Sequence, residues 1–228
     1  MFEPDQRFVK ICGITTVDDA LLAAGLGADA IGLIFAASSR RVTAGQARDI
    51  VRRLPPGVIS VGVFRNERRE RVVEVADQLG LRAVQLHGHE SPDDTAWVAE
   101  RVPNVFKAFA AGDPSLGRFD DYRPARALID SPEPGSGKPF DWHRLAADRP
   151  DFPFVLAGGL RPDNVAEAIE LLQPWGVDVA SGVEARPGVK DPVAVRTFIQ
   201  AARSTPLRAA GAPDPTPVAP SEGDSSAW

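Results

Sequence analysis

The stretch FVKICGITTVDDALLAAGLG, residues 8–27, contains one complete strand, loop and helix unit. Residues 8–14 form a short apolar run that closes with a glycine and an isoleucine, a pattern typical of a buried strand. A threonine or aspartate within residues 15–18 is the expected N-cap of the helix, and Gly25 and Gly27 are expected to end it. The segment therefore predicts a strand followed by a capped helix.

The same alternation recurs along most of the chain. Further strands are predicted at residues 30–35, 58–64, 83–88, 105–110, 126–130, 152–158 and 177–181, and helices at 44–54, 67–79, 92–101, 141–147, 162–172 and 192–203. Residues 112–122 are too rich in glycine and proline to predict a regular helix. Eight such units predict an α/β protein with parallel strands, and a single-domain (β/α)8 TIM barrel fits better than an open sheet.

Composition sets the limits of this domain. We expect residues 1–7 to be an N-terminal extension, 8–203 the barrel domain, and the Pro-, Ala- and Ser-rich residues 204–228 a disordered tail. A net charge of −5 argues against a nucleic-acid partner. The chain has no apolar run of the roughly 20 residues that cross a membrane, and no export signal. Together with a single cysteine, this predicts a cytoplasmic protein.

Polar residues near the predicted carboxyl ends of strands are the candidates for a site, because barrel enzymes place their chemistry there. These residues are Cys12, Gln85, His87, Asp130, Asp178, Ser181 and Gly182. Cys12 has two interpretations: a small buried apolar residue, or a reactive sulfur at the mouth of a site.

Charged residues inside the predicted strands need partners. Alternation predicts that Lys10, Lys107 and Asp178 point into the barrel, where buried charges must be paired. Strands 1 and 8 of a closed barrel are neighbours, so we expect Lys10 and Asp178 to compensate each other below the site. This pair is either structural or tunes Cys12.

Glycines at the ends of the last two strands indicate an anion site. Gly158 and Gly159 follow one strand, and Ser181 and Gly182 follow the next. Glycines let the backbone approach a ligand closely, and barrels often bind phosphate at this position. A bound phosphate would therefore contact backbone N–H groups of these two loops.

Several ordered motifs resemble one family. The chain resembles phosphoribosylanthranilate isomerase of tryptophan biosynthesis from about residue 8 to 203 in VKICGIT (9–15), GVF (62–64), VQLHG (84–88), GSGK (135–138) with FDW (140–142), AGGL (157–160), and DVASGVE (178–184) with GVKD (188–191). The resemblance implies a (β/α) barrel that performs an Amadori rearrangement of N-(5-phosphoribosyl)anthranilate to the 1-deoxyribulose 5-phosphate derivative. It implies a small-molecule substrate and no metal or organic cofactor. The sequence leaves open whether the protein is a monomer or a homodimer.

The resemblance also implies residue roles. The family's cysteine base aligns with Cys12, its aspartic acid with Asp130, and the arginine that meets the anthranilate carboxylate with Arg41. Arg40 is the immediate alternative for that carboxylate. By the same alignment, phosphate binds backbone amides around Gly158, Gly159, Ser181 and Gly182, while Gln85 and His87 are expected to shape the pocket.

The sequence departs from the family pattern at two loops. Residues 131–137 form a shorter, more proline-rich loop than is usual in the family, and Ala36–Ala37 replace a proline and a basic residue that many members carry.

Two other functions compete with this interpretation. The first is the histidine-pathway isomerase, which does the same chemistry with two aspartates; Cys12 argues against it. The second is a non-catalytic phosphate-binding module, which the presence of both Cys12 and Asp130 disfavours.

Overall fold

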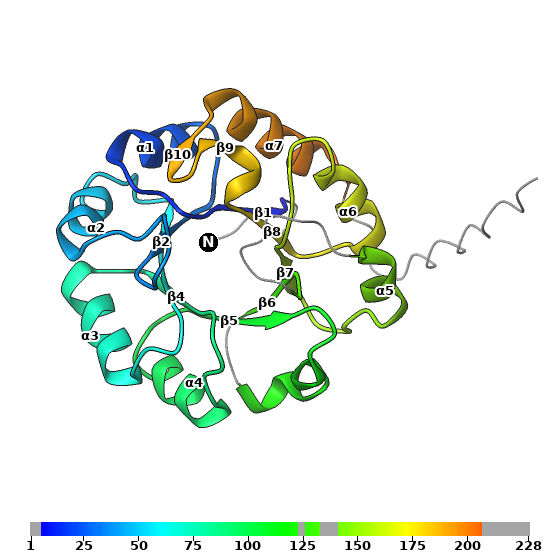
Figure 1. Ribbon diagram of the computed structural model, residues 1–228, viewed down its shortest axis with the longest axis horizontal. Helices are drawn as coiled ribbons and strands as arrows, with labels where there is room; N and C mark the ends of the chain where they lie inside the picture. Colours follow the sequence, from blue (N-terminus) through cyan, green and yellow to red (C-terminus); the bar gives the residue numbers. More distant parts are fainter. Residues whose placement is uncertain (1–5, 123–125, 133–140, 207–228) are drawn as a thin grey trace, which may run out of the picture.

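The eight predicted strands close into one parallel barrel, as Figure 1 shows in a view down its axis. The computed structural model describes residues 6–122, 126–132 and 141–206 of the 228-residue chain. The strands, in ring order, are β1 (Phe8–Ile11), β2 (Ala30–Ile34), β3 (Ile59–Phe64), β4 (Ala83–Leu86), β5 (Val105–Ala110), β6 (Arg126–Asp130), β7 (Phe154–Leu156) and β8 (Gly176–Val179). The (β/α)8 prediction is confirmed.

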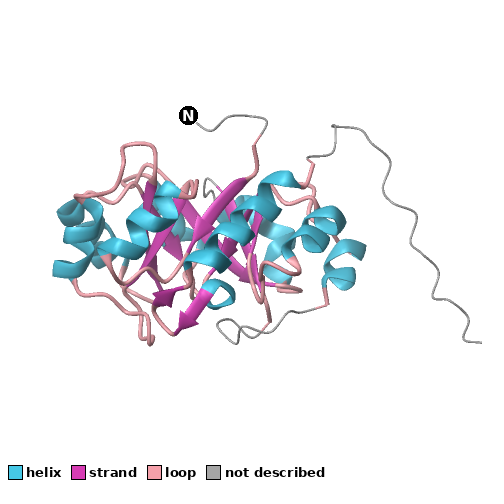
Figure 2. Ribbon diagram, turned by 90° about the horizontal axis from the view of Figure 1, so that it is seen from above, coloured by secondary structure: helices cyan, strands magenta, loops and turns pink. Residues whose placement is uncertain are grey.

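Helices cover the outside of the barrel and flank its strands on both sides in Figure 2. They are α1 (Val17–Gly25), α2 (Ala44–Val51), α3 (Arg69–Leu79), α4 (Pro92–Ala99), α5 (Trp142–Ala147), α6 (Val165–Leu172) and α7 (Pro192–Ser204). The expected cap of α1 is present, because the Thr16 side chain accepts a hydrogen bond from Asp19 N. The glycine-broken stretch forms the 3-10 helix η1 (Pro114–Tyr122), with a kink at Arg118.

The core has two layers that follow the alternation of side chains along each strand. Phe8 of β1 and Leu128 of β6 belong to the cluster inside the barrel, whereas Val9 and Ile129 of the same strands belong to the cluster beneath the helices. Both faces of every strand are therefore buried, which explains why the strands read as continuous apolar runs.

The predicted inward direction of Lys107 is wrong. Its neighbours Phe106 and Ala108 belong to the cluster inside the barrel, and Lys107 lies on the opposite, helix-facing side of β5. Its Nζ donates to Gly88 O at 2.7 Å and lies 3.1 Å from the Glu90 carboxylate. Because both faces of a barrel strand are apolar, the sequence did not reveal which set of alternate residues points inward.

A short antiparallel ribbon follows β8 and was not predicted. After the 3-10 helix η2 (Ser181–Val183), β9 (Glu184–Arg186) pairs with β10 (Val189–Lys190). The ribbon is held by distant residues: Thr15 Oγ1 donates to Gly188 O at 2.6 Å, and Lys190 N donates to the Asp19 carboxylate at 3.2 Å. Such short pairings depend on tertiary contacts, which local sequence patterns do not contain.

Some predictions fall on parts of the chain that the structure leaves undescribed. Of the proposed tail, Ser204 ends α7, and residues 207–228 lie outside the described residues, as do residues 1–5 and 133–140. Arg7, expected in the N-terminal extension, is buried and donates to Pro174 O. No helix within the described residues is long and apolar enough to cross a membrane.

Candidate active site

One cavity lies at the carboxyl ends of the strands and brings together residues from most of the barrel. Its volume is about 190 Å³. The candidate residues that line it are Cys12, Gln85, His87, Asp130, Gly158, Gly159, Asp178, Ser181 and Gly182, together with Arg40. All the predicted site residues except Arg41 therefore meet in one place. The agreement follows from the barrel itself, which gathers the ends of all eight strands at one rim.

Cys12 follows β1 directly, and only 6 % of its surface is exposed. Gly32 on β2 makes room for the thiol, because a side-chain Cβ at position 32 would lie 2.6 Å from Sγ. Burial raises the pKa of Cys12, while the positive charge of Lys10 acts in the opposite direction. The resting sulfur is thus a thiol, and it needs added positive charge nearby to become a thiolate.

Lys10 lies beneath Cys12 inside the barrel and pairs with Asp178 of the neighbouring strand β8. Its Nζ is 2.9 Å from Asp178 Oδ1, and both side chains are buried. Although burial opposes the charge on Lys10, the Asp178 carboxylate raises its pKa. The predicted compensation of these two charges is confirmed.

Asp130, the last residue of β6, is held at both carboxylate oxygens. Oδ1 accepts a hydrogen bond from Ser131 N at 2.7 Å, and Oδ2 lies 3.1 Å from His87 Nε2. The other ring nitrogen of His87 lies 2.6 Å from Gln85 Nε2. Gln85 and His87 therefore connect directly to the carboxyl group and form part of the cavity wall.

The glycine loop after β7 approaches Asp130 closely. Gly158 has a φ of +85°, and a Cβ there would lie 2.4 Å from Ser131 N and 2.8 Å from Asp130 Oδ1. Asn164 fixes the loop, because its Nδ2 donates to Gly159 O at 3.0 Å. Neither Gly158 nor Gly159 donates its N–H to a described residue, so both donors are available to a ligand.

The two adjacent arginines lie in different environments. Arg40 lines the cavity, and its guanidinium donates to both oxygens of Glu184, with an Nη2–Oε2 distance of 2.8 Å. Arg41 is exposed, lies beside Ile34 in an isolated parallel bridge, and forms no ion pair with a described residue. Its predicted contact with a carboxylate stays a prediction.

Sequence reasoning gave no role to Glu184 and Lys190, although both lie in quoted motifs. Lys190 Nζ is buried and lies 3.0 Å from Glu184 Oε1 and 2.9 Å from Ala180 O. Burial lowers the pKa of Lys190. Burial also opposes ionisation of Glu184, but the positive charges of Arg40 and Lys190 outweigh it and lower the pKa of Glu184. The sequence did offer one signal for these two residues, because both are charged and lie close to the end of an apolar strand.

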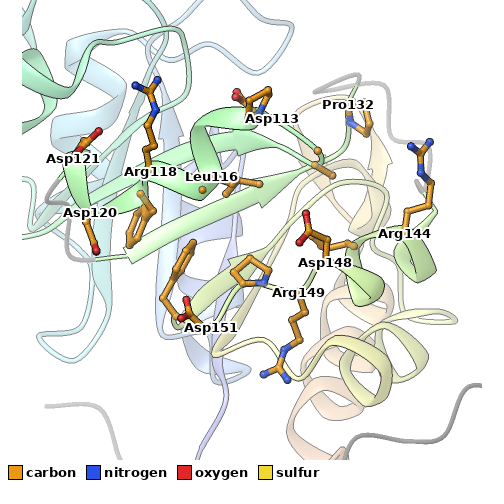
Figure 3. Close-up of a pocket in the computed structure, with 18 of the residues that line it drawn as sticks. Asp113, Leu116, Arg118, Asp120, Asp121, Pro132, Arg144, Asp148, Arg149 and Asp151 are labelled. Atoms are coloured by element: carbon orange, nitrogen blue, oxygen red, sulfur yellow. The ribbon is translucent and has the colours of Figure 1, made fainter.

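A larger cavity, of about 1450 Å³, lies outside the barrel between η1 and α5. Figure 3 shows that its labelled arginines, Arg118, Arg144 and Arg149, point in different directions and not toward one common point. None of the predicted site residues lines it. Size alone therefore does not identify the reactive site, and the smaller cavity at the strand ends, which gathers the predicted residues, is the candidate active site.

Comparison with known proteins gives the family. A family model described as N-(5'phosphoribosyl)anthranilate (PRA) isomerase matches residues 9–201. The chain belongs to the phosphoribosylanthranilate isomerase family. A relative from Pelobacter propionicus, N-(5'-phosphoribosyl)anthranilate isomerase, is 47% identical over 202 residues, which are 86% of this chain and 96% of the relative.

Solved phosphoribosylanthranilate isomerases share the fold. The crystal structure from Thermotoga maritima is 44% identical, with a TM-score of 0.80, and the match covers 86% of this chain and 98% of that chain. A second structure, with a TM-score of 0.77 and 42% identity over 86% and 98% of the chains, is a complex with reduced 1-(o-carboxyphenylamino)-1-deoxyribulose 5-phosphate. The chain is accordingly an isomerase of this family.

Proposed function

We propose that this cavity converts N-(5-phosphoribosyl)anthranilate to 1-(2-carboxyphenylamino)-1-deoxy-D-ribulose 5-phosphate in tryptophan biosynthesis, with Asp130 as general acid and Cys12 as general base. The observation that carries the proposal is that both residues, from non-adjacent strands, line one cavity. A rearrangement that moves a proton from carbon requires an acid and a base on the same bound sugar.

Asp130 supplies the first proton. Opening of the ribose ring breaks the bond between C1′ and the ring oxygen, and that oxygen takes a proton from the carboxyl group. The anilino nitrogen contributes its electron pair to C1′, which leaves an iminium ion. His87 lies 3.1 Å from Asp130 Oδ2, so it faces the oxygen from which the proton leaves.

Cys12 then removes the proton at C2′. The electrons of that C–H bond form the C1′–C2′ double bond and neutralise the iminium nitrogen, and the resulting enolamine tautomerises to the ketone. Burial raises the pKa of Cys12, so in the empty site the sulfur keeps its proton and cannot accept one from carbon. The positive charge of the iminium ion favours loss of the thiol proton to solvent, and the resulting thiolate then accepts the proton from C2′.

The two anionic ends of the substrate need local partners, since the protein carries a net charge of −5. The phosphate would bind N–H groups of the loops at Gly158, Gly159, Ser181 and Gly182, and Asp178 with Gln85 would border the sugar. Arg41 is the proposed partner of the anthranilate carboxylate, because the guanidinium of Arg40 is already bound to Glu184.

The reaction has no net oxidation or reduction, and the substrate supplies the positive charge that assists the base. We therefore propose that the enzyme needs no cofactor and acts on a small molecule in the cytoplasm. We propose that the protein is either a monomer or a homodimer.

A turnover assay on the purified protein tests the proposal. Loss of anthranilate-type fluorescence from phosphoribosylanthranilate is expected for the wild type, and the histidine-pathway aminoaldose serves as the matched second substrate. Tight binding of the reduced product analogue without turnover would support a non-catalytic module instead. Turnover of the second substrate alone would support the histidine-pathway function.

A further inference from the structure

Gln85, His87 and Asp130 form a continuous chain of polar contacts along the cavity wall. Gln85 Nε2 lies 2.6 Å from His87 Nδ1, and His87 Nε2 lies 3.1 Å from Asp130 Oδ2. All three residues line the cavity, and Gln85 is only 1 % exposed. A buried amide at the far end of a histidine that contacts a proposed acid can influence where protons lie in the chain.

One atom of this chain lacks a partner. Gln85 Oε1 is buried and has no hydrogen-bond partner among the described residues. The oxygen and nitrogen of a glutamine amide have nearly the same shape, so a half-turn of the amide exchanges them without disturbing packing. After this turn, Oε1 faces His87 Nδ1 and accepts a hydrogen bond from it.

The contacts of Asp130 favour one position for the proton that it delivers. Oδ1 accepts the N–H of Ser131, which favours the carbonyl form of that oxygen, so the proton is best placed on Oδ2, which faces His87 Nε2. An Oδ2–H group donates only to a ring nitrogen that carries no proton. A neutral His87 must then carry its proton on Nδ1, and this N–H needs an acceptor at Gln85.

The alternative proton arrangement leads to the same requirement. If the proton passes from Asp130 to His87, the ring is an imidazolium, and Nδ1 still carries a proton that faces Gln85. The orientation with Gln85 Nε2 toward Nδ1 instead fits a deprotonated Asp130, which accepts a hydrogen bond from His87 Nε2–H. The amide can thus serve both states, because it offers a donor on one side and an acceptor on the other.

We infer that Gln85 is a positioning residue that stabilises the protonated form of Asp130. The Gln85 carbonyl accepts a hydrogen bond from His87 Nδ1–H, and this leaves His87 Nε2 as the hydrogen-bond partner of the proton on Asp130 Oδ2. This inference rests on the proposed role of Asp130 and adds to it the residue that acts through His87. Gln85 itself transfers no proton.

Other charged groups that line the cavity could also affect the titration of this chain. They are Cys12 after β1, Arg40 and Arg65 after β2 and β3, and Asp178 on β8. Asp178 is paired with Lys10 and Arg40 with Glu184, and Gln85 is not a member of either pair. The experiment therefore compares variants at position 85 while the other charged residues that line the cavity are kept the same.

The proton position can be measured without turnover. The chain has three histidines, so ¹⁵N NMR of the imidazole nitrogens resolves them, and His87→Gln assigns the signals of His87. We expect a proton on Nδ1 at neutral pH in the wild type and in Gln85→Glu. In Gln85→Met, whose side chain has a similar shape but no acceptor, the Nε2–H tautomer should dominate. A wild-type Nδ1 without a proton at that pH would overturn the inference.

Kinetics supply the second readout. Gln85→Met should lower kcat about tenfold and move the alkaline limb of the kcat/KM profile to lower pH by about one unit, whereas Gln85→Glu should move it to higher pH. Gln78→Glu, an exposed change on α3, adds the same charge outside the site and should leave the profile unchanged. Shifts in the same direction for both variants at position 85, or none, would contradict the inference. A wild type without turnover would refute the proposed function and leave the NMR result as an independent test.

Discussion

Two walls of the same cavity hold their polar groups by different means. The first, here called the β1–β8 wall, presents Cys12 and Asp178 to the cavity. Behind them lie Lys10, Glu184 and Lys190, which hold this wall by buried ion pairs. The second, the β4–β6 wall, consists of Gln85, His87 and Asp130, and it is held by hydrogen bonds without a lysine or arginine in its chain of contacts.

The two walls surround the proposed base and the proposed acid with different kinds of neighbour. On the β1–β8 wall, two buried lysines favour a negative sulfur against the opposing effect of burial. On the β4–β6 wall, the carboxyl group is bonded to a histidine that can share its proton.

Removing the reactive group from either wall should give the largest effect. Cys12→Ser and Asp130→Asn should each lower kcat by roughly 10²- to 10⁴-fold, because a positioned acid or base contributes about that much. The Kd of the reduced product analogue should change only a few-fold. Steady-state kinetics and calorimetry measure both quantities, and wild-type-like turnover in either variant would remove that residue from its role.

The ion pair of the β1–β8 wall should matter for stability. Asp178→Asn leaves Lys10 buried without its partner and should lower the free energy of unfolding by about 3–5 kcal/mol. Urea denaturation measures the loss. As a control, Asp49→Asn breaks the exposed pair with Arg53 and should cause no measurable change. Equal stability of the two variants would show that the buried pair does not support this wall.

Glu184 should connect stability with pH. Glu184→Gln removes the partner of Arg40 and Lys190 and should cost about 3 kcal/mol at neutral pH. The pKa of Glu184 is lowered in the folded state, so its contribution is present above the ordinary glutamate pKa and is lost as the pH falls through the folded-state value. The difference from wild type should therefore be constant from pH 7 to about 5 and shrink below about pH 4. A difference that grows in acid would contradict this sign.

The arginines at the rim should give the smallest effect. Arg41→Ala should raise KM about tenfold with little change in kcat. A hydrogen bond to a charged group contributes about 1.5 kcal/mol to binding, which corresponds to a factor of about ten. Arg40→Ala is the matched comparison, and it should lower stability as well, because Glu184 loses a partner. If only the Arg40 variant changed KM, the carboxylate contact would belong to Arg40.

Family motifs and strand spacing located most of the cavity in advance. Cys12, Asp130 and the two glycine loops were placed correctly because each lies at or just after the end of a strand, and parallel strands in a closed barrel all end at one rim. The direction of Lys107 was missed, because apolar residues on both faces of β5 conceal the phase of alternation. The chain of contacts from Gln85 to Asp130 was also missed, since its link between His87 and Asp130 spans 43 positions of sequence.

The sequence by itself determined the number and order of strand and helix units, the barrel, and the residue types at the strand ends, because short-range periodicity and glycine positions encode them. Only the tertiary structure decided which charges pair, where the β9–β10 ribbon packs, and that Arg40 binds Glu184 while Arg41 stays exposed. The physical reason is distance along the chain. Lys10 and Asp178 are 168 residues apart and meet only when the barrel closes.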